Sequence, residues 1–504
     1  MTRDEGLFGG RVAWSLRRLP GAALATTLVM APAVAAQVQA SPSVANAEQA
    51  APAAPAPTQP STAQALPQLS PAQAGQLARL VAEDEVAQGL RPTRRSDLAA
   101  LPADALVRAA LDHARAVRSG RLGAADFQRD WGVRPQAYDP LPALADAVRR
   151  DRLAAWVKSL PPPYAGYDAL AAGLARYRAI EAAGGWPTLT GELKFGGSGA
   201  AVAKLRERLA IEDPQVAGSG DKFDVSLLEA VRRAQRRYGL NPTGQIGPQT
   251  LAALNVPPAT RIRQIAANME RWRWLPPELD RRRVQVNVAA AVLTVFEGDA
   301  PVMSMKAVTG RPGNETPMLV STIGSIVINP PWNVPESIAR NELWPKERAS
   351  PGYLKRNGFR VIDTGGGGKR LQQSSERSAL GRFKFDFPND FAVYLHDTPA
   401  QSGFSRFDRL ASHGCVRLEK PADLAKLLMR TTPAWQPEAI DAAVAAGRTV
   451  RAALAEPVSV YLLYWTAFAN AKGQVGFRDD PYGWDGKLAA KVEGRSAATA
   501  LAAK

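Results

Sequence analysis

One stretch near the C-terminal end of the chain gathers the residue types that nucleophilic catalysis requires. The chain has a single cysteine, Cys415, and two of its three histidines, His396 and His413, lie shortly before it. A thiol becomes a strong nucleophile as the thiolate, and an imidazole within hydrogen-bond reach can take its proton. We therefore predict that Cys415 is a nucleophile served by an imidazole base, and consider a purely structural origin the weaker interpretation.

The residues around this cysteine predict how such a site is built. Alternating residue types predict a strand over residues 392–396, which would place Tyr394 and His396 on one face. Gly414 lets the backbone come close to a substrate carbonyl, and the N–H of Cys415, alone or with that of Gly414, could hold an oxyanion. With His396 as base, we expect the thiol pKa to lie below the ~8.5 of a free cysteine.

The spacing from His396 to the run Ser412-His413-Gly414-Cys415-Val416-Arg417 resembles the signature of L,D-transpeptidases with a YkuD-type catalytic domain. Residues 307–311, 316–317, 329–335, 351–354, 381–385 and 394–399 also resemble that family, and the whole order resembles its large YcbB-like branch. The resemblance implies attack on the L,D bond after the third residue of a tetrapeptide stem. Terminal D-Ala would leave, and the acyl group would pass to an amine of a neighbouring stem.

The resemblance also implies roles for individual residues. Cys415 would be the nucleophile and His396 the general base, oriented by a nearby backbone carbonyl, for which that of Asp397 is the candidate. Arg417 would position a stem carboxylate or brace the loop, although an ordinary surface ion pair is an equal alternative. The implied supporting residues are His413, Gly414, Ser412 and Asp397, and the implied substrate-binding residues are Tyr394, Arg417, Trp332 and Asn333.

The elements that must position this site are predicted to be β-rich. Residues 284–288, 291–296, 302–308 and 318–328 carry strand signals, broken by glycines and a proline. We predict a catalytic domain over residues 261–485 with a capping insertion at 332–373, whose glycine run at 365–368 suits a lid. Residues 486–504 are predicted to be a flexible tail.

Two helical segments precede the catalytic domain. Apolar residues three and four apart predict a helical scaffold domain over residues 71–190, in which His113 is expected to face solvent because no orienting partner is in view. Residues 191–256 resemble a three-helix peptidoglycan-binding domain, although Ala234 stands where that family usually has an aromatic residue. A helical spacer that binds nothing is the alternative.

The N-terminus has the layout of an export signal. Arg11, Arg17 and Arg18 precede an apolar stretch that ends in small residues, which predicts a signal peptide over residues 1–36. A retained anchor is the alternative. Residues 37–70, rich in Ala, Pro and Ser, predict a disordered linker. We therefore expect export to the periplasm or cell envelope, with no stable membrane span after cleavage.

Composition and motifs limit the classes of partner and cofactor that we expect. The net charge of +16 attracts polyanions, among them the carboxylate-bearing cell wall. We expect no metal or other cofactor, because the chain lacks paired cysteines and a His-Glu-x-x-His motif. No aromatic-basic nucleic-acid module is recognisable. The expected partners are peptidoglycan stem peptides and glycan.

The sequence thus predicts an α+β multidomain protein: a β-rich YkuD-type domain with a capping insertion, a helical scaffold and a three-helix peptidoglycan-binding domain. Two other functions stay open. Water as acceptor would make the chain an L,D-carboxypeptidase, and loss of acylation would leave a catalytically inactive peptidoglycan-binding scaffold.

Overall fold

The computed structural model describes residues 65–191, 193–216, 219–470 and 473–502. The predicted signal peptide and most of the predicted linker lie outside the described residues. The end of that linker is different from the prediction, because Leu66 and Leu69 pack against the first group of helices. Their apolar side chains belong to that core, so a linker that runs to residue 70 is wrong at its C-terminal end. No helix in the described ranges is both long and apolar enough to span a membrane.

The first helices form a core of their own. They are α1 (Pro71–Ala87), α2 (Arg95–Ala99), α3 (Ala103–Ser119), α4 (Leu141–Arg149) and α5 (Leu153–Lys158). Ser70 caps α1, because its side chain accepts a bond from the Gln73 amide and the Gln73 side chain bonds back. Buried leucines and valines from these helices make one apolar cluster, which includes Leu77, Val81, Leu106, Val107 and Leu153.

His113 corrects the prediction of a solvated histidine. It lies on the buried face of α3, is 5% exposed, and its Nε2 lies 2.8 Å from Asp84 Oδ2 on α1. A buried imidazole needs such a polar partner. The prediction failed because Asp84 is remote in sequence and becomes a neighbour only when the two helices pack.

Five further helices lead to the sheet: α6 (Ala165–Ala182), α7 (Ala200–Glu212), α8 (Val225–Arg237), α9 (Pro248–Asn255) and α10 (Pro258–Trp272). Asp224 caps α8 by accepting a bond from the Leu227 amide at 2.8 Å. Helices α7, α8 and α9 fall in the segment that resembles a three-helix peptidoglycan-binding domain. Ala234 is buried there, facing the apolar core of this region.

The catalytic region is built on a sheet of nine strands in the order β10-β3-β11-β9-β8-β4-β12-β1-β2. Because β2 also pairs with β3, all of these strands except β10 form a closed circuit. The bounds are β1 (Arg282–Asn287), β2 (Val292–Glu297), β3 (Ala300–Gly310), β4 (Leu319–Ile328), β8 (Phe383–Asp386), β9 (Leu395–His396), β10 (Leu410–Ser412), β11 (Val416–Leu418) and β12 (Val450–Leu463).

The predicted strand at residues 392–396 is shorter than expected. Only Leu395 and His396 form β9, and Ala392 has a φ of 53°, a left-handed conformation that breaks an extended strand. The four earlier strand predictions correspond to β1, β2, β3 and β4. In β1 the polar Gln285 is buried along with its valine neighbours, so both faces of this strand are covered.

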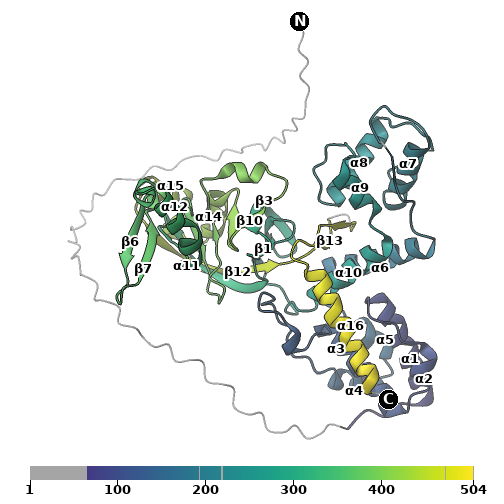
Figure 1. The fold of residues 1–504 in the computed structure, drawn as a ribbon. Coiled ribbons are helices and arrows are strands. Elements are labelled where there is room, and N and C mark those ends of the chain that lie inside the picture. Colours follow the sequence, from purple (N-terminus) through teal and green to yellow (C-terminus); the bar gives the residue numbers. More distant parts are fainter. Residues whose placement is uncertain (1–64, 192, 217–218, 471–472, 503–504) are drawn as a thin grey trace, which may run out of the picture. The chain divides into compact units, whose positions relative to one another are not determined.

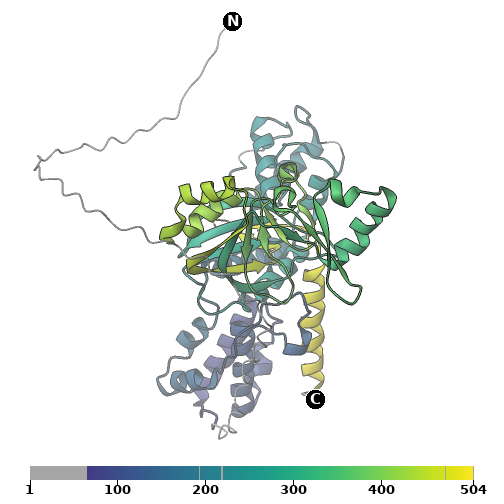
Figure 2. The same cartoon turned by 90° about the vertical axis from the view of Figure 1, so that its left-hand side faces the viewer.

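Residues 332–373 form a small lobe with its own sheet. Strands β5 (Trp332–Asn333), β7 (Lys369–Gln373) and β6 (Phe359–Asp363) pair in that order. Between β5 and β6 lie α11 (Glu336–Ile338), a π-helical turn (Ala339–Leu343), α12 (Trp344–Ala349) and α13 (Tyr353–Arg356). Figure 2 shows this lobe on the opposite side of the large sheet from α14 (Pro421–Met429) and α15 (Pro437–Ala445). Its apolar residues, among them Val334, Leu343, Leu354 and Leu371, form a separate cluster.

The C-terminal segment corrects the prediction of a flexible tail at 486–504. After the hairpin of β13 (Ala467–Ala469) and β14 (Val475–Phe477), helix α16 (Trp484–Ala502) packs on α10 and is drawn yellow in Figure 1. Trp484, Leu488 and Val492 are buried at a spacing of four residues, so one face of α16 belongs to the core. The alanine-rich composition concealed this apolar stripe.

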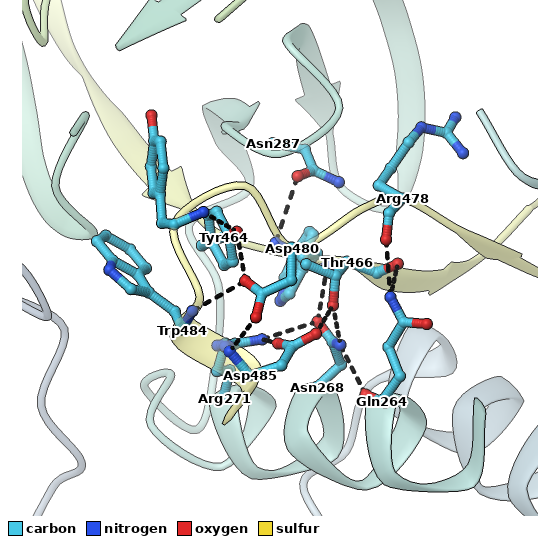
Figure 3. A network of polar contacts seen from close by, with 12 residues as sticks. Gln264, Asn268, Arg271, Asn287, Tyr464, Thr466, Arg478, Asp480, Trp484 and Asp485 are labelled. Carbon is cyan, nitrogen blue, oxygen red and sulfur yellow. Dashed lines mark hydrogen bonds and ion pairs between the residues drawn. The ribbon is translucent and has the colours of Figure 1, made fainter. Parts of the chain in front are cut away.

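Polar contacts also hold the start of α16 in place (Figure 3). Asp480 accepts bonds from the amides of Trp484 and Asp485 and from the Tyr464 hydroxyl. Asp485 in turn contacts Arg271 of α10 at 2.6 Å and accepts a bond from the Thr466 hydroxyl. A helix held at its first turn by these bonds is a fixed element of the fold.

Candidate active site

Two neighbouring parallel strands, β9 and β11, bring the predicted catalytic residues together. Their register pairs Leu395 with Val416 and His396 with Arg417. Leu395 and Val416 are fully buried in the core. Since side chains alternate along a strand, Tyr394, His396, Cys415 and Arg417 project from the other face of the two strands. The fold therefore places four sequence-predicted site residues on one surface.

The thiol of Cys415 is half-buried and is hydrogen-bonded to Tyr394. It accepts hydrogen bonds from the Tyr394 backbone amide and hydroxyl, and its Sγ lies 4.0 Å from the carbonyl of Ala392. Burial raises the pKa of this thiol, and the bonds from Tyr394 and the charges of Lys384 and Arg417 offset only part of that effect. The expectation of a lowered thiol pKa is wrong for this resting site, because burial outweighs the stabilising groups.

His396 is held as a neutral imidazole. It is 5% exposed, and its Nδ1 lies 2.5 Å from the carbonyl oxygen of Asp397. Because a carbonyl can only accept, Nδ1 carries the proton and Nε2 keeps a free lone pair. Burial, together with the positive charges of Arg417 and Lys384, lowers the pKa of His396 to about 3. The ring is therefore unprotonated at neutral pH, and in this resting site it is a weaker base than a free imidazole.

Tyr394 lies against both groups. Its ring meets the His396 ring edge to face at a centroid distance of 5.5 Å, and its hydroxyl bonds to the Cys415 sulfur. Among the described residues, the thiol and the His396 ring have no direct hydrogen bond. A catalytic pair often tightens only when substrate binds, so this resting geometry is compatible with proton transfer between them.

The lowered pKa of His396 predicts a pH-dependent stability. Below the ~6.5 of a free histidine the unfolded chain binds a proton that the folded chain rejects until about pH 3. The free energy of unfolding should therefore fall as pH falls through this window, by at most about 1.4 kcal/mol per pH unit from this residue. Urea titrations at pH 7 and pH 5 should show a larger loss for the wild type than for His396→Asn, which keeps a donor for the Asp397 carbonyl. Equal losses in both proteins would contradict the assignment.

The nucleophile loop, residues 413–415 between β10 and β11, is shaped by Ser412 and Gly414. The Ser412 hydroxyl donates to the Cys415 carbonyl at 2.6 Å and accepts from the Gly414 amide at 3.1 Å. Gly414 has a φ of 113°, a conformation that L side chains rarely adopt. Because the Gly414 amide is already used, it is not free as a second oxyanion donor. The Cys415 amide has no bond to another group in the described part of the chain, which leaves it available.

His413 has hydrogen-bond partners other than the thiol. Its Nε2 lies 2.6 Å from Glu342 Oε1 in the capping insertion and 3.4 Å from a guanidinium nitrogen of Arg311. The residue therefore joins the nucleophile loop to the insertion. Among the described residues no hydrogen bond joins His413 to Cys415, which separates the roles of the two histidines.

Arg417 and Asp397 differ in their partners. Arg417 is partly buried, burial lowers its pKa, and within the described ranges its guanidinium has no ion-pair partner. An unpaired cation on the face that carries the thiol is suited to a substrate carboxylate, whereas the surface ion pair considered from sequence is absent there. The Asp397 side chain accepts bonds from the amides of Arg382 and Thr398. It therefore fixes the turn whose carbonyl orients His396.

The two predicted substrate-binding residues of the insertion are placed differently. The Trp332 indole bonds to the Tyr394 hydroxyl, so the insertion reaches the site through this side chain. Asn333 is exposed and bonds to Gln372 at 2.9 Å within the small sheet. The structure thus brings Trp332, but not Asn333, into contact with the site residues.

Three residues near the site were not predicted from the sequence: Lys384, Glu342 and Thr316. The Thr316 hydroxyl donates to the Gly414 carbonyl. Lys384 stands opposite His396 in the register, and its Nζ lies 4.5 Å from the centre of the Tyr394 ring. Lys384 and Thr316 fall in segments that resembled the family, which was the available signal. Nothing in the sequence pointed to Glu342.

Comparison with known proteins identifies this surface. The family model described as "L,D-transpeptidase catalytic domain" matches residues 281–436, which contain Cys415 and His396. The chain carries a YkuD L,D-transpeptidase domain. Two other models match upstream of this L,D-transpeptidase domain: "Putative peptidoglycan binding domain" at residues 198–254 and "Scaffold domain" at residues 58–174. The fold class, with helices, a large sheet and an L,D-transpeptidase domain, is as predicted.

A curated relative and two solved structures are similar to parts of this chain. A curated protein of Haemophilus influenzae described as "Putative L,D-transpeptidase" is 29% identical over 241 residues, which cover 45% of this chain and 48% of that protein. The chain thus spans about half the length of the curated relative it matches. An L,D-transpeptidase structure from Xylanimonas cellulosilytica is 15% identical, covering 55% of this chain and 100% of that chain with a TM-score of 0.18. L,D-transpeptidase 3 from Mycobacterium tuberculosis is 13% identical, covering 36% and 61% with a TM-score of 0.20.

Proposed function

We propose that the chain is an exported peptidoglycan L,D-transpeptidase that forms 3→3 cross-links and acts in the periplasm or cell envelope. The observation that carries this proposal is the single surface formed by Cys415, Tyr394, His396 and Arg417, within the residues that match the catalytic domain. The match to a peptidoglycan-binding model supports a cell-wall substrate. We propose the division into domains given by the sequence, with the linker and C-terminal corrections above.

In this mechanism Nε2 of His396 takes the Cys415 proton as the sulfur attacks the carbonyl carbon of stem residue 3. The Asp397 carbonyl supports the proton-accepting ring by holding its Nδ1–H. The free amide of Cys415 donates to the oxyanion of the tetrahedral intermediate. The C–N bond to D-Ala then breaks, the leaving amine takes a proton from His396, and a thioester remains on Cys415.

The second half-reaction restores the enzyme. An amine of a neighbouring stem attacks the thioester carbonyl, loses a proton to His396, and forms the new amide. The C–S bond breaks and the thiol regains its proton. Arg417, an unpaired cation beside the thiol, is proposed to hold a stem carboxylate, and Trp332 to line the substrate cleft from the insertion.

The direct test is incubation of the full chain with purified tetrapeptide muropeptides, followed by mass spectrometry of the products. Cross-linked dimer with loss of D-Ala is the expected result. Tripeptide monomer would identify an L,D-carboxypeptidase, because water would then have accepted the acyl group. Unchanged substrate under conditions where Cys415 can still be alkylated would support an inactive peptidoglycan-binding scaffold and contradict the proposal.

A further inference from the structure

A chain of hydrogen bonds reaches the nucleophile loop from the side of the C-terminal segment. Thr316 is 0% exposed, and its hydroxyl donates to the Gly414 carbonyl at 2.6 Å while accepting from the Gly310 amide at 2.8 Å. Gly310 must be glycine for this approach, since a Cβ there would lie 2.1 Å from the Asn314 carbonyl oxygen. The Thr316 hydroxyl is thus held between two backbone groups with both of its roles used.

The bond to Gly414 acts on the next residue through the peptide plane. The Gly414 carbonyl and the Cys415 N–H belong to the same planar trans peptide, in which they point in opposite directions. Fixing the carbonyl oxygen therefore fixes the direction of the Cys415 N–H. A hydrogen bond to the carbonyl also polarises the amide, which strengthens the N–H as a donor.

Tyr482 holds Thr316 and Gly310 from the other side. Its hydroxyl donates to the Gly310 carbonyl at 2.6 Å and accepts from the Thr316 amide at 3.3 Å. The side chain is 5% exposed, and burial raises its pKa to about 12, so the hydroxyl stays protonated as a donor. Tyr482 lies beyond the residues that match the catalytic-domain model, which end at 436.

The Tyr482 ring packs against Tyr464 and Trp484, two residues of the network labelled in Figure 3. It stacks on Tyr464 at a centroid distance of 5.1 Å and meets Trp484 edge to face at 5.0 Å. The Tyr464 hydroxyl donates to Asp480 at 2.6 Å and also accepts from the Tyr482 amide at 3.2 Å. The position of the Tyr482 hydroxyl therefore depends on the segment that begins α16.

We propose that Thr316 and Tyr482 are positioning residues that preorganise the Cys415 amide as the oxyanion donor. This inference rests on the proposed function in assigning an oxyanion to the reaction. It extends the active-site machinery into the C-terminal segment. Neither side chain touches the substrate in this scheme, because both act through the Gly414–Cys415 peptide.

Two reactions of the Cys415 thiol distinguish positioning of the oxyanion donor from structural support of the whole nucleophile loop. Acylation by an ester passes through a tetrahedral oxyanion, whereas alkylation by iodoacetamide displaces iodide without forming one. Cys415 is the only cysteine, so the rate in excess of that of Cys415→Ala reports this thiol with each reagent. In Thr316→Val, acylation by p-nitrophenyl acetate should slow by roughly 10-fold to 100-fold, below the 10²–10³ cost of removing an oxyanion donor outright. Alkylation should stay within about twofold, because the sulfur and its bonds to Tyr394 are unchanged.

Three companion variants complete the test in the full chain. Thr316→Ser keeps the hydroxyl and should restore acylation to within about twofold, whereas Tyr482→Phe should slow acylation by roughly three- to tenfold. Tyr461→Phe is the matched control: it removes a hydroxyl bond to Asp280 that is not part of this chain of bonds, so it should change neither reaction.

Parallel loss of acylation and alkylation in Thr316→Val would overturn the proposal, since the loop would then have lost its structure. Unchanged acylation in Thr316→Val would overturn it as well. Absence of muropeptide turnover in the wild type would count against the proposed function. The comparison of acylation and alkylation among the variants would still test the positioning role, because p-nitrophenyl acetate does not require a peptidoglycan stem.

Discussion

Cys415→Ala should abolish acyl transfer and leave the folded structure in place. No other cysteine exists to replace the nucleophile, so residual muropeptide turnover should fall below roughly 10⁻³ of wild type. The loop bonds of Ser412 involve only the backbone of Gly414 and Cys415, and the substitution keeps them. Product analysis by mass spectrometry gives the turnover, and thermal unfolding should give a transition close to that of the wild type.

Cys415→Ser provides the matched control for shape. Serine fits the same space, but its hydroxyl is a far weaker nucleophile than a thiolate with the same histidine base. Both variants should therefore be inactive while keeping wild-type unfolding curves. Measurable cross-linking by Cys415→Ala would remove the nucleophile assignment, because no covalent intermediate could then form at this position.

The second large effect separates the two site histidines. His396→Ala should lower the rate of acyl transfer by roughly 10²–10⁴, the usual range for loss of a general base. His413→Ala should keep activity within about tenfold of wild type, since its ring bonds to Glu342 and Arg311 and not to the thiol. Single-turnover acylation by a muropeptide measures this step directly.

His113→Gln is the control for loss of a histidine as such, since His113 bonds to Asp84 in the helical core. It should leave acyl transfer near wild type. A larger loss in His413→Ala than in His396→Ala would assign the base to His413.

Wild-type alkylation by iodoacetamide should become fast only above about pH 8.5, because burial raises the pKa of the thiol.

Local patterns in the sequence predicted much of the fold. Strands β1 to β4 were visible from β-branched residues broken by glycines, and the first helices from apolar residues three and four apart. Cys415 and His396 stood out because the chain has so few residues of either type. The low counts of cysteine and histidine can be seen without knowledge of the fold.

What the sequence concealed depends on long-range packing. The contacts of His113 with Asp84 and of His413 with Glu342 join residues that are distant in the chain. The raised thiol pKa follows from burial, which no neighbour of Cys415 in sequence reveals. The buried face of α16 was hidden by an alanine-rich composition in which three apolar residues spaced by four carry the packing.

The strand pairings around β3 affect the order in which the chain folds. The last residues of β3 pair with both β10 and β11, so the three-residue nucleophile loop is clamped at both ends to one strand. Leu418 pairs with Ala307, far back along the chain, and contacts of such long range are slow to form because the intervening chain must be closed first. During refolding, helical content should therefore return before reactivity of Cys415 toward esters. A newly made chain would therefore carry its thiol without the aligned base and oxyanion donor until these strands pair.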